Sequence, residues 1–137
     1  MLEEKDEKCI ELKLPMPPSV NGAYNNAMKW RSKTDAYKDY EDIVLYTLMK
    51  KRFRIVGDKW LNVFYEFHFP IYNEDGSKKK KDTFNFEKCL SDALAKAIPG
   101  FHDHKIIEWR VRKVNDEEKY VIVRIWEDLD SKNICKT

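Results

Sequence analysis

Four segments of the chain are predicted to be β-strands, three from the two-residue period of their apolar residues and the last from its β-branched residues. They span residues 9–14, 60–69, 105–114 and 119–126. The second segment has the clearest pattern, because every other residue from Leu61 to Phe69 is apolar. The last two segments are separated only by the polar stretch Asn115 to Glu118, which predicts that they form a β-hairpin.

Two further segments repeat their apolar residues at helical spacing. Ser32 or Thr34 can cap a helix that runs to about Arg52, and Asn85 can cap a second helix that runs to about Ala97. The resulting order is strand, helix, strand, helix, strand, strand. This order favours an α+β fold, a two-layer sandwich in which the helices cover one face of a small mixed sheet.

Length and composition favour one domain over several. The chain has 137 residues, of which 42% are hydrophobic, so we expect a single domain over residues 1–137, with a charged, disordered lead-in at residues 1–8. No apolar run approaches the roughly 20 residues that cross a bilayer, so we expect no membrane partner. Cys9, Cys89 and Cys135 lack metal-ligand spacing, which predicts free thiols in a cytoplasmic protein.

Positive charge is concentrated in two places, although the net charge is only +2. One cluster lies between Lys50 and Arg54, and the other is an unbroken run of lysines. The run consists of Lys78, Lys79, Lys80 and Lys81. A cationic face of this kind suits the backbone of a nucleic acid, although a lysine run can also be an ordinary solvated loop.

Candidate catalytic residues flank the second predicted helix. Asp82 follows the lysine run and Asp103 lies beyond the helix end, while Lys88 lies on the polar face between them. Carboxylates suit Mg²⁺, which phosphodiester hydrolysis uses to activate water, and a lysine could neutralise the phosphorane. A helix of about thirteen residues separates its ends by about 20 Å. Either the Asp103 loop returns along the helix, or the site is assembled differently.

Three stretches of this chain resemble one known family. The segment from Lys81 to Leu94 resembles the signature D-x-D-N-x-x-K-x-x-x-D-A-L of the RusA-type Holliday-junction resolvases. Phe101 to Ile107 resembles the downstream D-D-x-x-V/I segment of that family, and Leu14 to Asn21 resembles its LPxPPSxN element. The stretches occur in the family's order and extend over most of the chain.

The resemblance implies a homodimeric, Mg²⁺- or Mn²⁺-dependent endodeoxyribonuclease that resolves four-way DNA junctions in recombination and repair, in a family common on prophages. Asp82 and Asp103 match the metal-binding aspartates, and Lys88 matches a lysine that assists catalysis. Asn85 matches the motif asparagine, which we expect to contact DNA together with the lysine run.

One position departs from the signature. Phe84 stands where the family has its second aspartate, and a benzyl group cannot bind a cation. Glu87 and His102 are candidate substitute ligands. The alternative is a junction-binding relative that cleaves weakly or not at all, and a third hypothesis is a small interaction protein without specific DNA contacts.

The tryptophans divide into two groups. Trp109 and Trp126 lie in apolar strands and are predicted to be core residues. Trp30, between Lys29 and Arg31 in a polar segment, is predicted to contact DNA.

Overall fold

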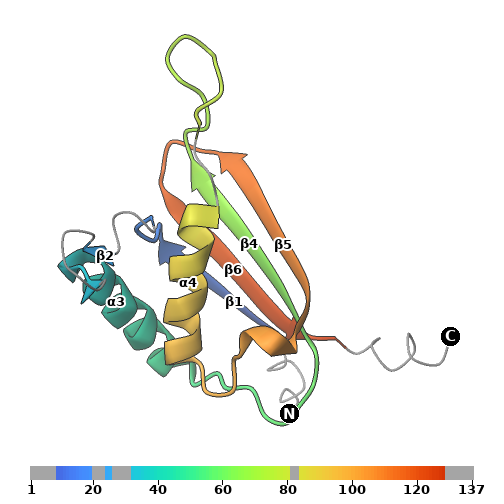
Figure 1. Cartoon of the computed structure of the whole chain (residues 1–137). Helices are drawn as coiled ribbons and strands as arrows, with labels where there is room; N and C mark the ends of the chain where they lie inside the picture. Colours follow the sequence, from blue (N-terminus) through green and yellow to red (C-terminus); the bar gives the residue numbers. More distant parts are fainter. Residues whose placement is uncertain (1–8, 20–23, 26–31, 81–83, 129–137) are drawn as a thin grey trace, which may run out of the picture.

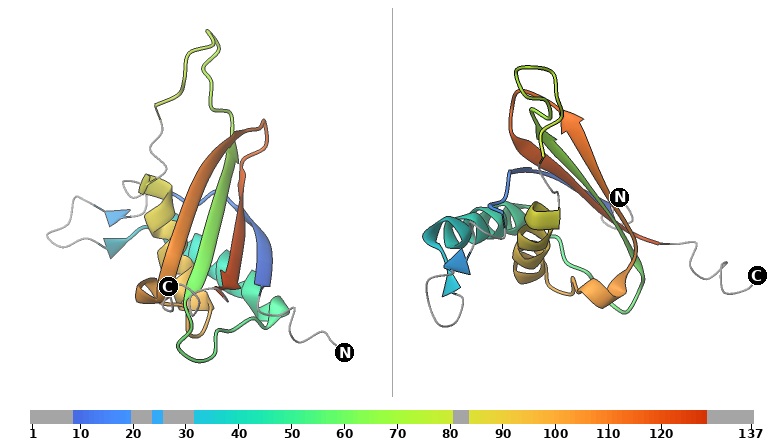
Figure 2. Two further views of the ribbon diagram at one scale, coloured as in Figure 1. Left: turned by 90° about the vertical axis from the view of Figure 1, so that its right-hand side faces the viewer. Right: turned by 45° about the horizontal axis from the view of Figure 1, so that its top comes forward.

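A computed structural model describes residues 9–19, 24–25, 32–80 and 84–128, which form an α+β fold. The main sheet is mixed: its order is β1-β6-β4-β5, with β4 and β5 parallel and the other pairs antiparallel. Helices α3 and α4 lie together on one face of this sheet (Figures 1 and 2). The bounds of these elements are β1 (Cys9–Pro15), α3 (Asp35–Lys51), β4 (Leu61–Phe69), α4 (Phe84–Ala97), β5 (Ile106–Asn115) and β6 (Tyr120–Glu127).

Three short elements add to the predicted order. Strands β2 (Tyr24–Asn25) and β3 (Ser32–Lys33) form a separate antiparallel pair before α3. A 3-10 turn, η1 (Asp103–Lys105), leads into β5.

The predicted hairpin between the last two strands is wrong. Strand β4 lies between β5 and β6, so their connection crosses the end of β4, where the Asp116 amide donates to the Phe69 carbonyl at 3.1 Å. Five β4 side chains that face the helices are at most 2% exposed. They are Leu61, Val63, Tyr65, Phe67 and Phe69. The strand with the most apolar surface gains most from a central position, because neighbours then cover it from both sides.

The helix limits follow local signals. Thr34 caps α3, because its hydroxyl accepts from the Tyr37 amide at 3.3 Å, and Arg52 ends the helix in the left-handed conformation. Asn85 is not the residue before α4, as predicted, but its second residue. The two helices are joined by an ion pair, Lys96 Nζ to Glu41 Oε1 at 3.2 Å.

The prediction that Trp109 and Trp126 are core residues is wrong. Trp109 is 38% exposed because it lies on the edge strand β5. Trp126 is half-buried at the mouth of a cavity. The predictions for Trp30 and for residues 1–8 fall outside the described residues.

The cysteines and the length of the helices were also subjects of the sequence predictions. Among the described residues, Cys9 is an exposed free thiol and Cys89 a buried one, whereas Cys135 falls outside them. No helix in the described ranges is both long enough and apolar enough to cross a membrane.

Candidate functional site

A hydrogen-bonded chain holds Glu87 in the first turn of α4. The Ser91 hydroxyl, one helical turn further on, donates to Glu87 Oε2 at 2.6 Å. The hydroxyl of Tyr65 lies 2.8 Å from Ser91 Oγ. Because the serine proton is directed to the carboxylate, Tyr65 is the donor in this second bond. The fully buried ring of Tyr65 thus links the core strand β4 to the Glu87 carboxylate.

Further charged groups surround Glu87. Partial burial is the main cause that raises the pKa of Glu87, and the Ser91 hydrogen bond opposes this effect. The negative charges of Asp103 and Asp92 raise the pKa of Glu87 further, and the Lys88 ammonium lowers it. Lys88 Nζ also lies 3.5 Å from Asp92 Oδ2 on the exposed side of α4. Lys88 and Asp103, which the sequence singled out separately, thus have opposite effects on the pKa of Glu87.

The backbone after α4 turns and is anchored to the segment that follows α3. Gly100 has φ +88°, a conformation that a glycine adopts without strain. The neighbouring Pro99 carbonyl accepts from the Ile55 amide at 2.8 Å. Lys105 Nζ then donates to the carbonyl oxygens of Gly57 and Gly100, at 3.0 and 3.2 Å. These contacts hold the Asp103 turn against the segment after α3, where β5 begins (Figure 1), and the two alternatives for Asp103 stay predictions.

The donor chemistry of this cluster fits a hard divalent cation. Glu87 and Asp103 carry carboxylate oxygens, the ligands that such a cation prefers. In the described ranges alone, no three His, Cys, Asp or Glu side chains lie close enough together to hold a metal ion. Asp82 falls outside those ranges, so the pairing of Asp82 with Asp103 stays a prediction.

The signature positions at the start of α4 are only partly described. Phe84 and Asn85 are the first two residues of the helix. Predictions that concern their side chains, and those for Lys81, fall outside what the structure describes.

His102, the other candidate substitute ligand, has a different neighbour. Its ring is parallel to that of His104, with 5.6 Å between centroids and 7° between planes, and both side chains are exposed. Glu87 differs from His102 because its carboxylate is held by a hydrogen bond from Ser91 at 2.6 Å.

The lysine run lies on an arm, residues 71–80, that extends beyond the end of β4 (Figure 1). The Asn73 amide donates to the Ser77 carbonyl at 2.7 Å, and the Lys79 amide donates to the Ile71 carbonyl at 2.8 Å. The side chains of Lys78 and Lys80 are exposed, whereas that of Lys79 is half-buried. The arm therefore has internal structure and presents two ammonium groups to solvent.

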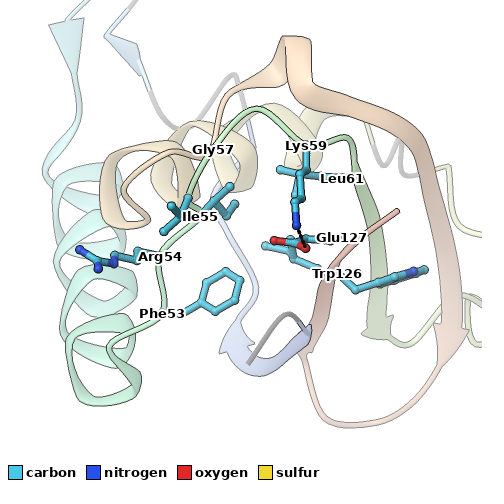
Figure 3. A pocket seen from close by; sticks show the side chains of 10 residues that line it. Phe53, Arg54, Ile55, Gly57, Lys59, Leu61, Trp126 and Glu127 are labelled. Carbon is cyan, nitrogen blue, oxygen red and sulfur yellow. Dashed lines mark ion pairs between the residues drawn. The ribbon is translucent and has the colours of Figure 1, made fainter. Parts of the chain in front are cut away.

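A cavity of 450 Å³ lies elsewhere, between the segment after α3 and the ends of β4 and β6 (Figure 3). Phe53, Ile55 and Trp126 contribute apolar side chains, and Lys59 Nζ lies 3.5 Å from Glu127 Oε1 at its wall. Among the described residues that line it, none was singled out from the sequence as a site residue. The candidate site is the acidic cluster beside α4, not this cavity.

The charge at Glu87 makes stability depend on pH in a defined direction. A raised pKa means that the folded protein holds this proton more tightly than the unfolded chain. The stabilisation is complete below the unfolded pKa and is lost as the pH rises through the folded pKa. Glu87→Gln keeps an oxygen that accepts from Ser91 and removes the charge. In EDTA at about pH 7 we expect this variant to have a higher free energy of unfolding than the unchanged protein.

The measurement is urea unfolding of both proteins between about pH 3.5 and pH 7. Glu117→Gln, an exposed glutamate between β5 and β6, serves as the control. A stabilisation of Glu87→Gln that grows as the pH falls would contradict the assignment.

The sequence interpretation missed Ser91 and Tyr65 as residues that position the site. The sequence did contain a signal for Ser91: it lies four residues after Glu87, so the two side chains share a helix face. The other partner, Tyr65, is distant in sequence, and no local pattern connects it to α4.

Comparison with known proteins adds an independent finding. The family model for endodeoxyribonuclease RusA matches residues 15–126, which is more than half of the chain. No curated protein matches the chain.

Proposed function

The chain belongs to the RusA endodeoxyribonuclease family, whose members resolve DNA junctions, and we propose that it is an active, divalent-metal-dependent nuclease of four-way junctions. The observation that carries this proposal is the family match over residues 15–126, which include Asp82, Lys88 and Asp103. The Glu87 carboxylate, which accepts from Ser91 at 2.6 Å in the first turn of α4, supports an acidic site at this end of the helix.

The side chains have distinct roles in this proposal. Asp82 and Asp103 would hold Mg²⁺ or Mn²⁺, with Glu87 as a further carboxylate in place of the aspartate that Phe84 replaces. When bound, the cation supplies an activated water and stabilises charge on the phosphate. Ser91 orients Glu87 through the 2.6 Å hydrogen bond. Lys88 lies beside the cluster, where its ammonium can stabilise negative charge that develops on a phosphate.

We further propose that the protein acts as a homodimer in the cytoplasm, in recombination and repair. Two copies would present two sites to the two strands that must be cut for a junction to be resolved.

The direct test uses the full chain and a labelled four-way junction. Nicking is measured with Mg²⁺, with Mn²⁺ and with EDTA, beside a linear duplex of the same sequence. We expect paired nicks on opposed strands of the junction, in either metal but not in EDTA. If junction and linear DNA are bound equally at about 150 mM salt and neither is cut, the proposal fails.

Phe84 provides a second candidate function. If Glu87 does not replace the missing aspartate, the protein would bind junctions and cut them poorly. Phe84→Asp would then gain nicking over the unchanged protein by about tenfold or more, at equal junction affinity. Efficient nicking by the unchanged protein would exclude this alternative.

A separate prediction concerns the contribution of the arm, residues 71–80, to the affinity for junctions. Each lysine that neutralises a phosphate contributes about 0.9 to the slope of log affinity against log salt. Lys78→Ala combined with Lys80→Ala should weaken junction binding and reduce that slope by about 2. Fluorescence anisotropy at several salt concentrations measures both quantities.

The matched control is Lys38→Ala, an exposed lysine on α3. It should leave the slope unchanged. An unaltered slope in the double arm variant would exclude the arm from the DNA interface.

A further inference from the structure

The segment that follows α3 lines two neighbouring spaces. One is the cavity of 450 Å³ at the start of β4, and the other is a hollow of 610 Å³ beside the start of β1. Phe53, Arg54 and Val56 line both. Pockets that bind small molecules have volumes of about 300 to 1,000 Å³. Together the two spaces can therefore accommodate a ligand with two parts, one in the cavity and one in the hollow.

The interior of the cavity is apolar and contains an aromatic ring. Ile55, Leu61 and Ile125 line it and are buried. The half-buried ring of Phe53 points into the cavity, across from Glu127 (Figure 3). A flat ring of a ligand can stack on Phe53 here while the apolar walls shield it from water.

An ion pair supplies polar groups at the wall of this cavity. Lys59 Nζ lies 3.5 Å from Glu127 Oε1, and the Glu127 side chain is only 13% exposed. A carboxylate accepts hydrogen bonds and an ammonium donates them. The pairing edge of each DNA base carries a donor beside an acceptor, and proteins read this edge when the base is unpaired. The ion pair therefore suits the edge of a base whose ring stacks on Phe53.

The hollow is lined by positive charge. Lys51 is the last residue of α3, Arg52 and Arg54 follow it, and all three are exposed. Among the described residues that line the hollow, none is acidic. The segment is held in place, because the Ile55 amide donates to the Pro99 carbonyl at 2.8 Å. The three cations thus lie at fixed positions beside the cavity, where they suit phosphate groups.

We propose that the cavity and the hollow together bind single-stranded DNA. One unpaired base enters the cavity and stacks on Phe53, and the phosphates beside it contact the three cations of the hollow. An aromatic ring next to a cationic groove is how proteins bind single strands without a preference for sequence. A duplex fits less well, because its bases are paired and stacked and must leave the helix to enter a cavity.

This site is distinct from the lysine arm. The cavity includes Leu61, the first residue of β4, whereas the arm of residues 71–80 lies beyond Phe69, the last residue of β4. Eight steps of about 3.3 Å separate the two ends of the strand by about 26 Å. A branched DNA can therefore contact the arm with a paired region and the cavity with an unpaired strand. The inference goes beyond the proposed nuclease function, because it requires neither a metal ion nor cleavage.

The test compares two labelled oligonucleotides of about ten nucleotides by fluorescence anisotropy in EDTA. One carries thymine at every position, and the other has the same phosphates but no bases. We expect the full chain to bind the oligothymidylate at least about fivefold more tightly, because one stacked base contributes that much. Phe53→Leu should abolish this preference. It should leave the affinity for the abasic strand unchanged, which shows that the variant is folded.

The cations should affect both oligonucleotides. Each phosphate contact to a single strand contributes about 0.7 to the slope of log affinity against log salt. Lys51→Ala combined with Arg54→Ala should therefore weaken the binding of both and reduce each slope by about 1.4. The preference for the oligothymidylate should remain, because Phe53 is unchanged.

Two control variants should keep the full preference for the oligothymidylate. Phe64→Leu changes a half-buried phenylalanine that lies on the other face of β4, because it alternates with Val63 and Tyr65. Lys78→Ala combined with Lys80→Ala removes the two exposed ammonium groups of the arm.

A photochemical cross-link locates the base. An oligothymidylate with one 5-iodouracil, a base that reacts with aromatic side chains on irradiation, should become attached to Phe53. Peptide mass spectrometry identifies the residue, and Phe53→Leu should lose the cross-link.

Equal affinity for the two oligonucleotides, a preference that survives Phe53→Leu or is lost in the arm variant, or a cross-link confined to the arm would each overturn the site. Because no readout involves a junction or nicking, failure here is distinct from failure of the proposed nuclease function.

Discussion

Replacing Asp103 by asparagine is expected to reduce junction nicking by at least about a hundredfold while leaving junction affinity within about threefold. Asparagine keeps the shape of the side chain and removes the charge that the proposal assigns to cation binding. Affinity should persist because lysines that contact phosphates supply most of it. Single-turnover nicking and anisotropy on the same junction separate the two quantities.

The same substitution has a readout that does not depend on activity. Because the Asp103 carboxylate is one of the groups that raise the pKa of Glu87, the pKa of Glu87 should fall in Asp103→Asn. NMR of the Glu87 carboxyl carbon during a pH titration in EDTA measures this change in pKa. Asp39→Asn, an exposed aspartate on α3, is the control and should change neither nicking nor Glu87. Full nicking by Asp103→Asn would remove Asp103 from the catalytic site.

Replacing Gly100 by alanine is expected to lower the free energy of unfolding by about 3 kcal/mol. Two costs combine at this position. The backbone has φ +88°, which strains any residue with a Cβ, and the new methyl group would overlap the Ile55 carbonyl oxygen. That oxygen belongs to backbone, which cannot move aside as the end of a side chain could. Urea unfolding monitored by tryptophan fluorescence measures the loss.

Gly76→Ala separates the two costs. Gly76 has φ +89°, but a Cβ there would have no atom within 4 Å. It should therefore lose only about 1 kcal/mol from backbone strain. Equal losses at the two positions would show that the close approach to Ile55 contributes nothing. Because Gly100 lies in the turn that leads to Asp103, Gly100→Ala should also slow nicking in the fraction that remains folded.

The elements themselves could be predicted from local sequence. Alternation from Leu61 to Phe69 and the Thr34 cap depend only on neighbours in the chain, and both agree with the structure. The neighbours of each strand could not be predicted in this way. The short connection from Asn115 to Glu118 suggested a hairpin, but β4 occupies the position between the two strands. The choice depends on how much apolar surface each arrangement buries over the whole sheet.

The candidate site, like the fold, could be predicted from the sequence only in part. The sequence alone determined the family, through the motif residues and their spacing, and it indicated Asp103, Lys88 and Glu87 as candidates. Only the tertiary structure decided that Tyr65 and Ser91 hold the Glu87 carboxylate and that Trp109 lies exposed on an edge. The physical reason is distance along the chain: periodicity and capping are set within one or two turns, whereas these contacts join elements through a core that forms only when the sheet and helices pack.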